Sequence, residues 1–367
     1  MLFTNCRYNS DNKMNQPANI VFVSMTNHMG GAENVINTIA TINSSPIIFL
    51  KRVFKQCLPV TDSSKHVYLT TKPLAIGFLT LLTAIYKYRK NYTIISSHPY
   101  LNAYLGILKR VGYLKSDLIV RESTLLFTRY SGLKRLSYKM MYYLGYPSVN
   151  KVICQSELMK KELLEHNSFI DRNKAVVLGN PVDLDQIYKL AESPFPELSE
   201  QKYICAAGRL IELKGFDILI NAFAKIASEV NDVNLIILGD GPELAKLTSL
   251  ISNHNLQSRI KLAGHVSNPY PYFKQATLCV VSSLIEGFPN VLLQMIALNS
   301  EVVSTLCAGG IEDIPFIVTV PTHSVDELST AMLLSLKDAS LKDDNYDVKT
   351  TFFRVRKPQY FLDAVLN

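Results

Sequence analysis

The stretch SSLIEGFPNVLLQMIALN, residues 282–299, decides the fold of the second half of this chain. It continues the apolar run TLCVVSS, so it predicts a buried strand that ends near Glu286, a turn through glycine and proline, and an apolar helix. Pro289 suits the first helical turn, because its missing N–H would be unpaired there anyway. The amides of residues 290–292 would then point outward from the helix start, a position that favours phosphate oxygens. An ordinary strand–turn–helix unit would have the same pattern. Glu286 favours a ligand site, because a carboxylate at that place needs partners such as sugar hydroxyls.

Short β-branched runs alternate with helical patterns along the rest of the chain. In the first half, such runs precede helical patterns at residues 19–24, 92–97 and 151–156. The alternation restarts after Tyr203, with runs at residues 203–208, 234–240, 261–264, 277–283 and 301–305. A strand followed by a helix, repeated, builds a parallel sheet with helices on both faces. The sequence therefore predicts an α/β protein with two Rossmann-like domains whose strand C-termini face each other across a cleft.

The boundaries between the domains are predicted from changes in amino-acid composition along the chain. Residues 1–180 form the first domain and residues 181–345 the second. The proline-rich, acidic segment 180–201 between them is typical of a linker. The amphipathic end of the tail, residues 346–367, needs a partner surface, and we expect it to pack back on the first domain.

Composition excludes several classes of protein. At 367 residues, with 48% hydrophobic and 19% charged residues, the chain is globular and long enough for two cores. Its six cysteines include no CxxC pair, which favours reduced thiols over a disulfide or zinc framework. The polar first residues argue against a secretory signal, and the apolar run at 73–86 is shorter than the roughly 20 residues that a spanning helix needs. We therefore expect a cytoplasmic protein.

Charge is distributed unevenly. Residues 1–180 hold 23 Lys/Arg and 9 Asp/Glu, a net charge of +14, whereas residues 181–367 hold 15 and 22, a net charge of −7. Cations interleave with tyrosines in TRYSGLKRLSYKMMYYLGY, residues 128–146, as in segments that contact anionic lipid head groups. A solvated helix face explains the pattern equally well. No nucleic-acid-binding motif accompanies the charge, so we expect no nucleic-acid partner.

Two cations mark a phosphate site after the first strand of the second domain. In AAGRLIELKGFD, Gly208 ends the strand and Arg209 and Lys214 follow in the loop. Arginine offers a fixed fork of donors and lysine a point charge, a pair that can bind a diphosphate. The later LGDGPE lacks the third glycine of a dinucleotide fingerprint, so it indicates a tight turn near a nucleotide rather than a nicotinamide site. The loop CAGGIEDIP, residues 307–315, is either another amide-rich anion loop or a simple turn.

Taken together, these motifs carry a family resemblance. GGAE near the start, GRL..KGFD, LGDGPE, EGFPNVLLQM and GGIEDI resemble the retaining glycosyltransferases of family 4, which have the GT-B fold. The match covers both domains and is strongest over residues 204–315. It implies transfer of a hexose or N-acetylhexosamine, with retention and without a metal ion or other cofactor. The donor would be a nucleotide diphosphate sugar, with UDP favoured. The acceptor would be a glycan or lipid-linked glycan of cell-surface polysaccharide synthesis, reached at the inner face of the membrane.

The resemblance also implies roles for individual residues. In the catalytic group, Arg209 and Lys214 would neutralise the departing diphosphate, Glu286 would bind the donor sugar, and His98 would lie beside the transferred sugar. The implied donor-binding residues are Gly31, Gly208, Gly264, His265, Val266, Gly287, Phe288, Pro289, Asn290, Val291, Leu292 and Gln294. The implied acceptor-binding residues are Gly30, Glu33, Arg121 and Glu122.

One position departs from the family. Relatives usually have a second glutamate that binds the ribose hydroxyls, and here that position is Gln294. A neutral acceptor forms a weaker hydrogen bond than a charged one, so we expect a loss on the order of 1 kcal/mol in donor binding.

Three other functions stay open. Asp183 and Asp185 have the spacing of the metal site of a GT-A enzyme, although they follow a linker-type Asn–Pro. An epimerase of the same two-sheet shape would need further acid and base groups beside His98. A nucleotide-sugar-binding protein without transferase activity would be consistent with Gln294.

Overall fold

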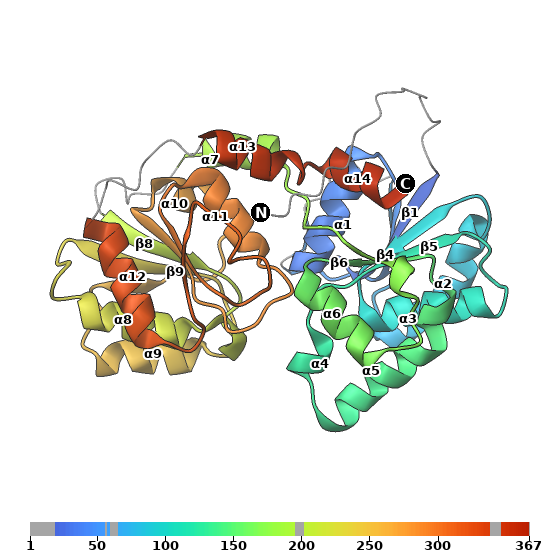
Figure 1. The fold of residues 1–367 in the computed structure, drawn as a ribbon, viewed down its shortest axis with the longest axis horizontal. Coiled ribbons are helices and arrows are strands. Elements are labelled where there is room, and N and C mark those ends of the chain that lie inside the picture. The colour runs from blue at the N-terminus through green and yellow to red at the C-terminus, as the bar shows by residue number, and fades with distance from the viewer. Residues whose placement is uncertain (1–18, 56, 59–64, 195–201, 338–345, 367) are drawn as a thin grey trace.

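The computed structural model describes residues 19–55, 57–58, 65–194, 202–337 and 346–366, which form two α/β lobes lying side by side (Figure 1). Each lobe has one parallel sheet with helices on both faces. The prediction of two Rossmann-like sheets in series is confirmed.

The first lobe is built on a seven-stranded sheet. Its order is β3-β2-β1-β4-β5-β6-β7, and every pair is parallel. The first strand of the described residues, β1, lies in the middle of the sheet, and later strands extend the sheet in both directions, which leaves a crevice at the C-terminal ends of β1 and β4. The strands are β1 (Ile20–Thr26), β2 (Ile47–Lys51), β3 (His66–Thr70), β4 (Thr93–Ser96), β5 (Asp117–Arg121), β6 (Lys151–Cys154) and β7 (Ala175–Val177).

Helices cover both faces of this sheet, which is why its strands are continuous apolar runs. One face carries α1 (Gly31–Ile42) and α14 (Pro358–Leu366). The other carries α2 (Leu74–Ile85), α3 (Pro99–Arg110), α4 (Leu126–Arg129), α5 (Gly132–Gly145) and α6 (Glu157–His166).

The second lobe repeats this plan with six parallel strands, in the order β10-β9-β8-β11-β12-β13. They are β8 (Lys202–Ala207), β9 (Val233–Leu238), β10 (Ile260–Leu262), β11 (Leu278–Val281), β12 (Val302–Thr305) and β13 (Val318–Val320). One face packs on α8 (Phe216–Ile226), α9 (Leu244–Asn253) and α12 (Val325–Lys337), and the other on α7 (Leu184–Ala191), α10 (Tyr270–Gln275), α11 (Asn290–Leu298) and α13 (Tyr346–Arg354).

The segment predicted as a linker contains a helix. α7 buries Ile187 and Ala191, four residues apart, against α10 and α11 of the second lobe. Its acidic composition misled the prediction, because Asp185 and the other charges lie on the outward face of an amphipathic helix. Residues 195–201 lie outside the described part of the chain.

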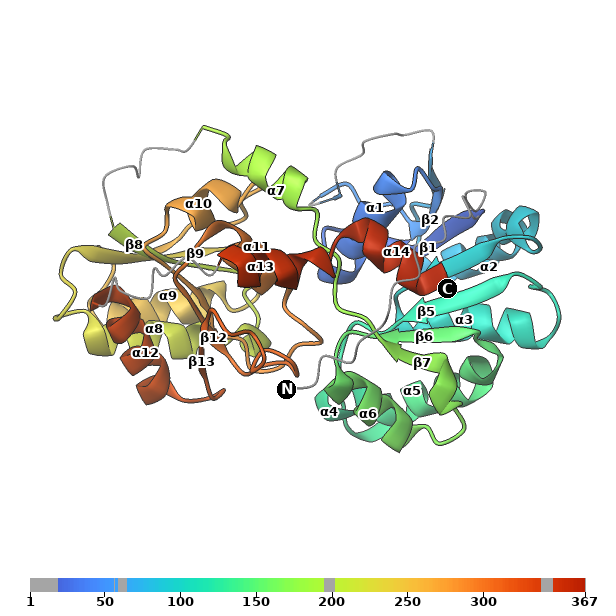
Figure 2. The same cartoon turned by 45° about the horizontal axis from the view of Figure 1, so that its top comes forward.

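The tail crosses from one lobe to the other (Figure 2). We expected all of residues 346–367 to pack on the first domain, but Phe353 of α13 is buried in the core of the second lobe. Only α14 reaches the first, where Phe361 and Val365 pack against the helix α1. The chain passes between the lobes near Val182 and again near Arg356. A hydrogen bond joins the two passages, because Val182 N donates to Arg356 O at 2.7 Å.

The apolar run at 73–86 forms α2, a helix of 12 residues buried on one face only: Leu81 is inaccessible, whereas Leu79 is 69% exposed. None of the helices in the described ranges combines the length and apolar character of a membrane-spanning segment. The described cysteines, Cys57, Cys154, Cys205, Cys279 and Cys307, are all unpaired, and Cys6 lies outside the described residues.

Candidate active site

A cleft of about 1140 Å³ lies between the lobes, at the C-terminal ends of both sheets. Parallel strands collect the loops that follow them at this edge, which is why residues far apart in the sequence meet there. The predicted site residues that line it are Gly30, Gly31, Glu33, Arg121, Gly208, Arg209, Lys214, His265, Val266, Glu286, Phe288, Pro289, Asn290, Val291 and Gln294. Five others do not line it: His98, Glu122, Gly264, Gly287 and Leu292.

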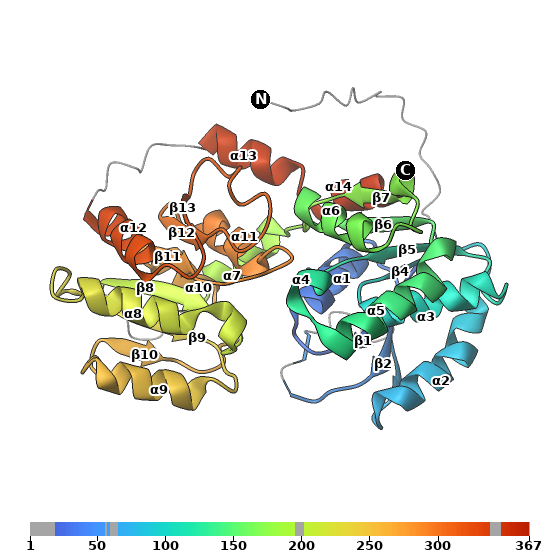
Figure 3. The same ribbon diagram turned by 60° about the horizontal axis from the view of Figure 1, so that its bottom comes forward.

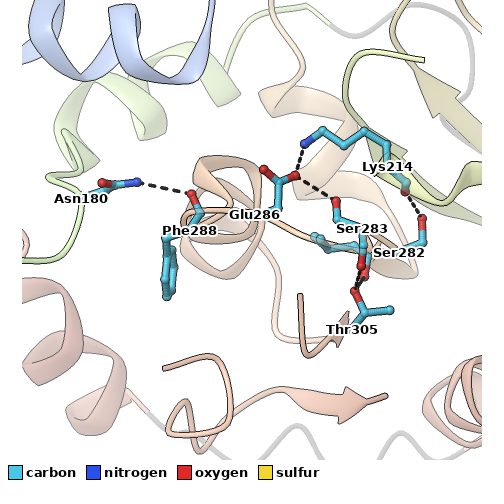
Figure 4. Close-up of polar contacts among 8 residues, drawn as sticks. Asn180, Lys214, Ser282, Ser283, Glu286, Phe288 and Thr305 are labelled. Atoms are coloured by element: carbon cyan, nitrogen blue, oxygen red, sulfur yellow. Dashed lines mark hydrogen bonds and ion pairs between the residues drawn. The ribbon is translucent and has the colours of Figure 1, made fainter. Parts of the chain in front are cut away.

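Lys214 and Glu286 form the central ion pair of the cleft (Figure 4). Lys214 Nζ lies 2.6 Å from Glu286 Oε1, and Ser283 Oγ donates to the same oxygen at 3.0 Å. Backbone contacts fix both partners: Ser282 Oγ donates to Lys214 O, and Glu286 N donates to Cys307 O. Both side chains are about one-fifth exposed, so the pair is held rigidly and still open to a ligand.

Arg209 is the exposed cation beside this pair. No hydrogen bond or ion pair to its guanidinium occurs within the described residues, which leaves its donors available to a ligand. Its loop is held against the loop after β9, because Leu210 N donates to Asp240 O and Glu243 N donates to Leu210 O. The LGDGPE motif therefore forms a turn that supports the loop with Arg209.

Gly239 makes this close approach possible. Its φ is +141°, and a Cβ there would lie 1.8 Å from Gly208 O. We expect Gly239→Ala to lower the free energy of unfolding by about 3 kcal/mol, through backbone strain and a clash that no side-chain rotation relieves. Chemical denaturation measures the change. Gly310→Ala is the control, because its φ of +90° is strained but nothing lies within 4 Å. Equal losses in the two variants would contradict the close-approach explanation.

The start of α11 points into the cleft as predicted, with one difference. Asn290 and Val291 line the cleft, and their amides belong to the first helical turn, where no intrahelical acceptor exists. Leu292 was wrongly included, because its amide donates to Pro289 O at 3.1 Å and its side chain is buried in the core. Gly287 packs against the first lobe instead, where an added Cβ would lie 2.5 Å from Ser123 O.

The facing wall is the start of α1 in the first lobe. Asn290 Nδ2 donates to Gly31 O at 3.0 Å, so the two helix starts meet across the cleft. Behind Gly31, His98 Nε2 lies 2.9 Å from Glu33 Oε1. Burial raises the pKa of Glu33, but the hydrogen bond and electrostatic attraction to His98 outweigh it and hold the pKa below its ordinary value. Glu33 thus fixes His98, whose Nδ1 is buried without a hydrogen-bond partner among the described residues.

Arg121 and Glu122 are adjacent in sequence but have different surroundings. Arg121 lines the cleft, and its Nη1 donates to Ser97 Oγ at 2.9 Å; burial lowers its pKa to about 10. Glu122 was wrongly assigned to the acceptor, because alternate residues of a strand point to opposite faces. Its carboxylate lies inside the first lobe and accepts hydrogen bonds from the buried hydroxyls of Tyr142 and Tyr146.

The buried carboxyl of Glu122 predicts that the stability of the first lobe depends on pH. Burial raises its pKa above the ordinary value near 4.3, although the tyrosine hydrogen bonds oppose the shift. The neutral carboxyl therefore favours the folded state at low pH, and this contribution is lost as pH rises through the folded-state pKa. We expect the midpoint temperature of the wild type to fall relative to that of Glu122→Gln as pH rises above about 4.3. Scanning calorimetry across this range tests the difference. Midpoint temperatures of wild type and Glu122→Gln that change in parallel with pH would contradict the prediction. The control is Glu165→Gln on α6, because Glu165 is exposed.

Asn180 is the residue that sequence reasoning missed as a functional residue. It is 1% exposed at the crossing between the lobes, and its Oδ1 accepts from Arg121 Nη2 at 2.5 Å. Its Nδ2 lies within hydrogen-bonding distance of Asn290 Oδ1 (2.5 Å), Gln155 Oε1 (3.3 Å) and Phe288 O (3.4 Å). No local pattern indicated this role, because its partners lie between 25 and 110 residues away.

The groups predicted to bind the nucleoside come from the loop after β10 and from α11. His265 and Val266 line it, whereas Gly264 lies behind them and accepts from Gly239 N at 2.7 Å. Gln294 Nε2 donates to Tyr270 Oη at 3.4 Å. Burial and the charge of Asp183 raise the pKa of Tyr270 to about 12, so its hydroxyl stays a donor at neutral pH.

The aspartates considered for a GT-A metal site have structural positions. Asp183 caps α7 by accepting from Gln186 N at 3.0 Å, and Asp185 is exposed in the first turn of that helix. Over the described ranges, no three His, Cys, Asp or Glu side chains gather where they could hold a metal ion. The two-sheet architecture also differs from the GT-A fold that this alternative needed.

Comparison with known proteins places this site in a family. Residues 201–338 match the family model described as glycosyl transferases group 1. The chain is 29% identical over 288 residues to N-acetylgalactosamine-N,N'-diacetylbacillosaminyl-diphospho-undecaprenol 4-alpha-N-acetylgalactosaminyltransferase of Campylobacter jejuni, covering 75% of this chain and 77% of that protein. It is 33% identical over 190 residues to an uncharacterized glycosyltransferase of Methanocaldococcus jannaschii, covering 50% of this chain and 46% of that protein.

The fold agrees over almost the whole chain. The structure of Anabaena HepE in complex with UDP and glucose superimposes with a TM-score of 0.76 at 17% identity, covering 95% of this chain and 98% of that one. The expected GT-B fold is thereby confirmed. The second lobe thus matches the group 1 glycosyltransferases, the similarity to a glycosyltransferase extends over both lobes, and these matches with the shared GT-B fold support a transferase.

Proposed function

We propose that this transferase moves a hexose or N-acetylhexosamine from a UDP-sugar to a lipid-linked glycan, with retention of configuration and without a metal ion. It would act in cell-surface polysaccharide synthesis, at the cytoplasmic face of the membrane. One observation carries the proposal: Arg209, the Lys214–Glu286 pair and the start of α11 all line the same interlobe cleft.

This arrangement suits a departing diphosphate. As the bond between the sugar and the diphosphate breaks, negative charge accumulates on the leaving group and positive charge on the sugar ring. Arg209, Lys214 and the start of α11 would stabilise the negative charge of the leaving group from fixed positions, so they need no reorganisation during the reaction. Glu286 has a second oxygen, Oε2, with which it could accept hydrogen bonds from sugar hydroxyls while Oε1 holds the lysine.

The contact between the two helix starts supports retention. A retaining transfer without a covalent intermediate needs the acceptor to approach from the side of the leaving group. Asn290, a proposed diphosphate-binding residue, contacts Gly31, which lies next to the proposed acceptor residue Gly30, so an acceptor bound along α1 would approach the sugar from the side of the diphosphate. His98, held by Glu33, would then lie behind the transferred sugar.

The identity of donor and acceptor draws on the relatives. The name of the Campylobacter jejuni protein describes transfer of N-acetylgalactosamine to an undecaprenyl-diphosphate-linked sugar, and the HepE structure has UDP and glucose. An undecaprenyl-type acceptor also agrees with the excess of cations in residues 1–180.

The test is a donor and acceptor screen. The purified chain is incubated with UDP-linked glucose, galactose, N-acetylglucosamine and N-acetylgalactosamine, and with GDP-mannose. An undecaprenyl-diphosphate disaccharide serves as the acceptor, and a chelator is present throughout. We expect one UDP-sugar to yield a lipid-linked product with an α linkage, identified by mass spectrometry and NMR. A donor at 100 times its dissociation constant also adds ~2.7 kcal/mol of stability, which a thermal-shift screen detects.

Other outcomes would replace the proposal. Consumption of the UDP-sugar without an acceptor would indicate an epimerase or a hydrolase. Donor binding without turnover on any acceptor would indicate a binding protein. Loss of activity in the chelator would overturn metal independence.

A further inference from the structure

The outer face of α5 has an exposed apolar stripe. Leu133 is 86% exposed, Leu136 62%, Met140 57% and Tyr143 58%. Their spacings of three, four and three residues place them on one side of the helix. Large apolar side chains gathered in this way mark an interaction surface, whereas single exposed ones do not.

The opposite side of α5 explains why the stripe faces outward. Tyr138 and Tyr142 are buried against the rest of the first lobe, and Ser137 Oγ lies 2.9 Å from the hydroxyl of Tyr100 on α3. These contacts fix the rotation of the helix about its axis. The stripe is therefore a rigid, preformed feature of the surface.

The charge of the helix with the stripe, and of the three α-helices before it, has a single sign, whereas α6, the next α-helix along the chain, has acidic side chains. The four helices α2, α3, α4 and α5 contain no aspartate or glutamate at all. Their cations include Lys134, Arg135 and Lys139 on α5, and Lys134 Nζ lies 4.0 Å from the ring centre of Tyr130. Long lysine side chains next to an apolar stripe can reach lipid head groups while the stripe enters the acyl boundary.

The stripe is also close to the cleft along the chain. Ser123 and Thr124 line the cleft, and the next residues form α4 and then α5. Figure 3 shows α4 and α5 together at the front of the first lobe, near the second lobe. α14 packs on the other face of the first sheet, so the tail does not cover the stripe.

We propose that α5 docks this protein on an anionic phospholipid bilayer, with Leu133, Leu136, Met140 and Tyr143 in the interface and the flanking cations among the head groups. A second copy of the chain is the less suitable occupant. In a two-fold dimer the same patch meets itself, so the cations of α5 would face their own copies, and α5 itself has no acidic side chain to compensate them. The inference rests on the proposed function for the lipid-linked acceptor, but docking itself needs no catalysis.

Vesicle flotation of the whole chain tests the docking. We expect binding to vesicles of equal parts phosphatidylglycerol and phosphatidylcholine, weaker binding to phosphatidylcholine alone, and release by added salt. Leu136→Glu should lower the affinity about tenfold or more, because it removes one buried leucine from the interface. Lys139→Ala should lower it about fivefold. Leu334→Glu on α12 is the matched control, since that leucine is 59% exposed on the second lobe and should leave binding unchanged.

The possible failures are distinguishable. Wild-type binding by Leu136→Glu, or equal binding to both kinds of vesicle, would overturn the docking surface. A dimer in sedimentation that Leu136→Glu dissociates, without vesicle binding, would assign the stripe to a second copy instead. Transfer of sugar to a detergent-solubilised acceptor is measured on the same samples. If transfer persists while vesicle binding is absent, only the docking inference is wrong. If vesicle binding persists while transfer is absent, only the proposed function is wrong.

Discussion

Replacing Lys214 with alanine is expected to lower kcat by ~10² to 10³, the usual cost of removing one preorganised group that stabilises charge in a transition state. The side chain lies 2.6 Å from Glu286 Oε1 in the cleft, and both groups are partly exposed there. The substitution therefore removes the lysine from the reacting region without opening a cavity in the core. Steady-state kinetics with the donor and acceptor from the screen measure the loss, and circular dichroism checks the fold.

Arg209→Ala should have an effect of the same size, because its exposed guanidinium has no partner within the described residues that would compensate for its loss. Lys225→Ala is the matched control. This lysine also forms an ion pair, with Asp326, but on the outer side of the second lobe, and it should keep wild-type kinetics. Turnover near that of the wild type in either Lys214→Ala or Arg209→Ala would refute the assignment of the diphosphate site.

Asn180→Ala should reduce both activity and stability. The substitution leaves the buried Arg121 Nη2 without its acceptor and removes the donor to Asn290 Oδ1. Each buried group left without a partner costs roughly 1–3 kcal/mol, so we expect the free energy of unfolding to fall by about 3 kcal/mol. Because Asn290 also contacts Gly31, the two helix starts should lose their alignment. A misplacement of about 1 Å can lower kcat ~10²-fold.

The donor should still bind to Asn180→Ala, since Arg209 and Lys214 belong to the second lobe alone. Asn299→Ala is the matched control, because Asn299 Nδ2 also makes two hydrogen bonds, to Phe273 O and Ala276 O, but within one lobe. Denaturation, donor titration and kinetics on both variants separate the effects. Loss of kcat in both variants, or in neither, would contradict a role for Asn180 in aligning the lobes.

The local pattern of the chain was enough to predict much of this molecule. Each parallel strand is a short apolar run followed by an amphipathic helix, and these patterns repeat in order through both lobes. The loops after β8 and β11 also lie where the sequence places them, so that Arg209, Lys214 and Glu286 meet at one edge of the second sheet. Their meeting follows from topology alone, because parallel strands deliver consecutive loops to the same edge.

Tertiary packing decided what local patterns could not. Arg121 is the last residue of β5 and Glu122 is the next residue, yet Glu122 lies in the core and Arg121 lines the cleft. Leu292 follows two cleft-lining residues, but the rotation of α11 buries it. Residues 184–191, within the segment predicted as a linker, form a helix because the second lobe offers them an apolar surface.

Asn180 is the clearest case of this division. Its neighbours in sequence predict a linker, whereas its hydrogen bonds reach both lobes. The sequence by itself determined the strands, the helices and the edge at which ligands bind, because these follow from the hydrophobic period and from parallel topology. Which side chains join the two lobes depends on contacts between residues up to 259 positions apart, and no local pattern encodes such contacts.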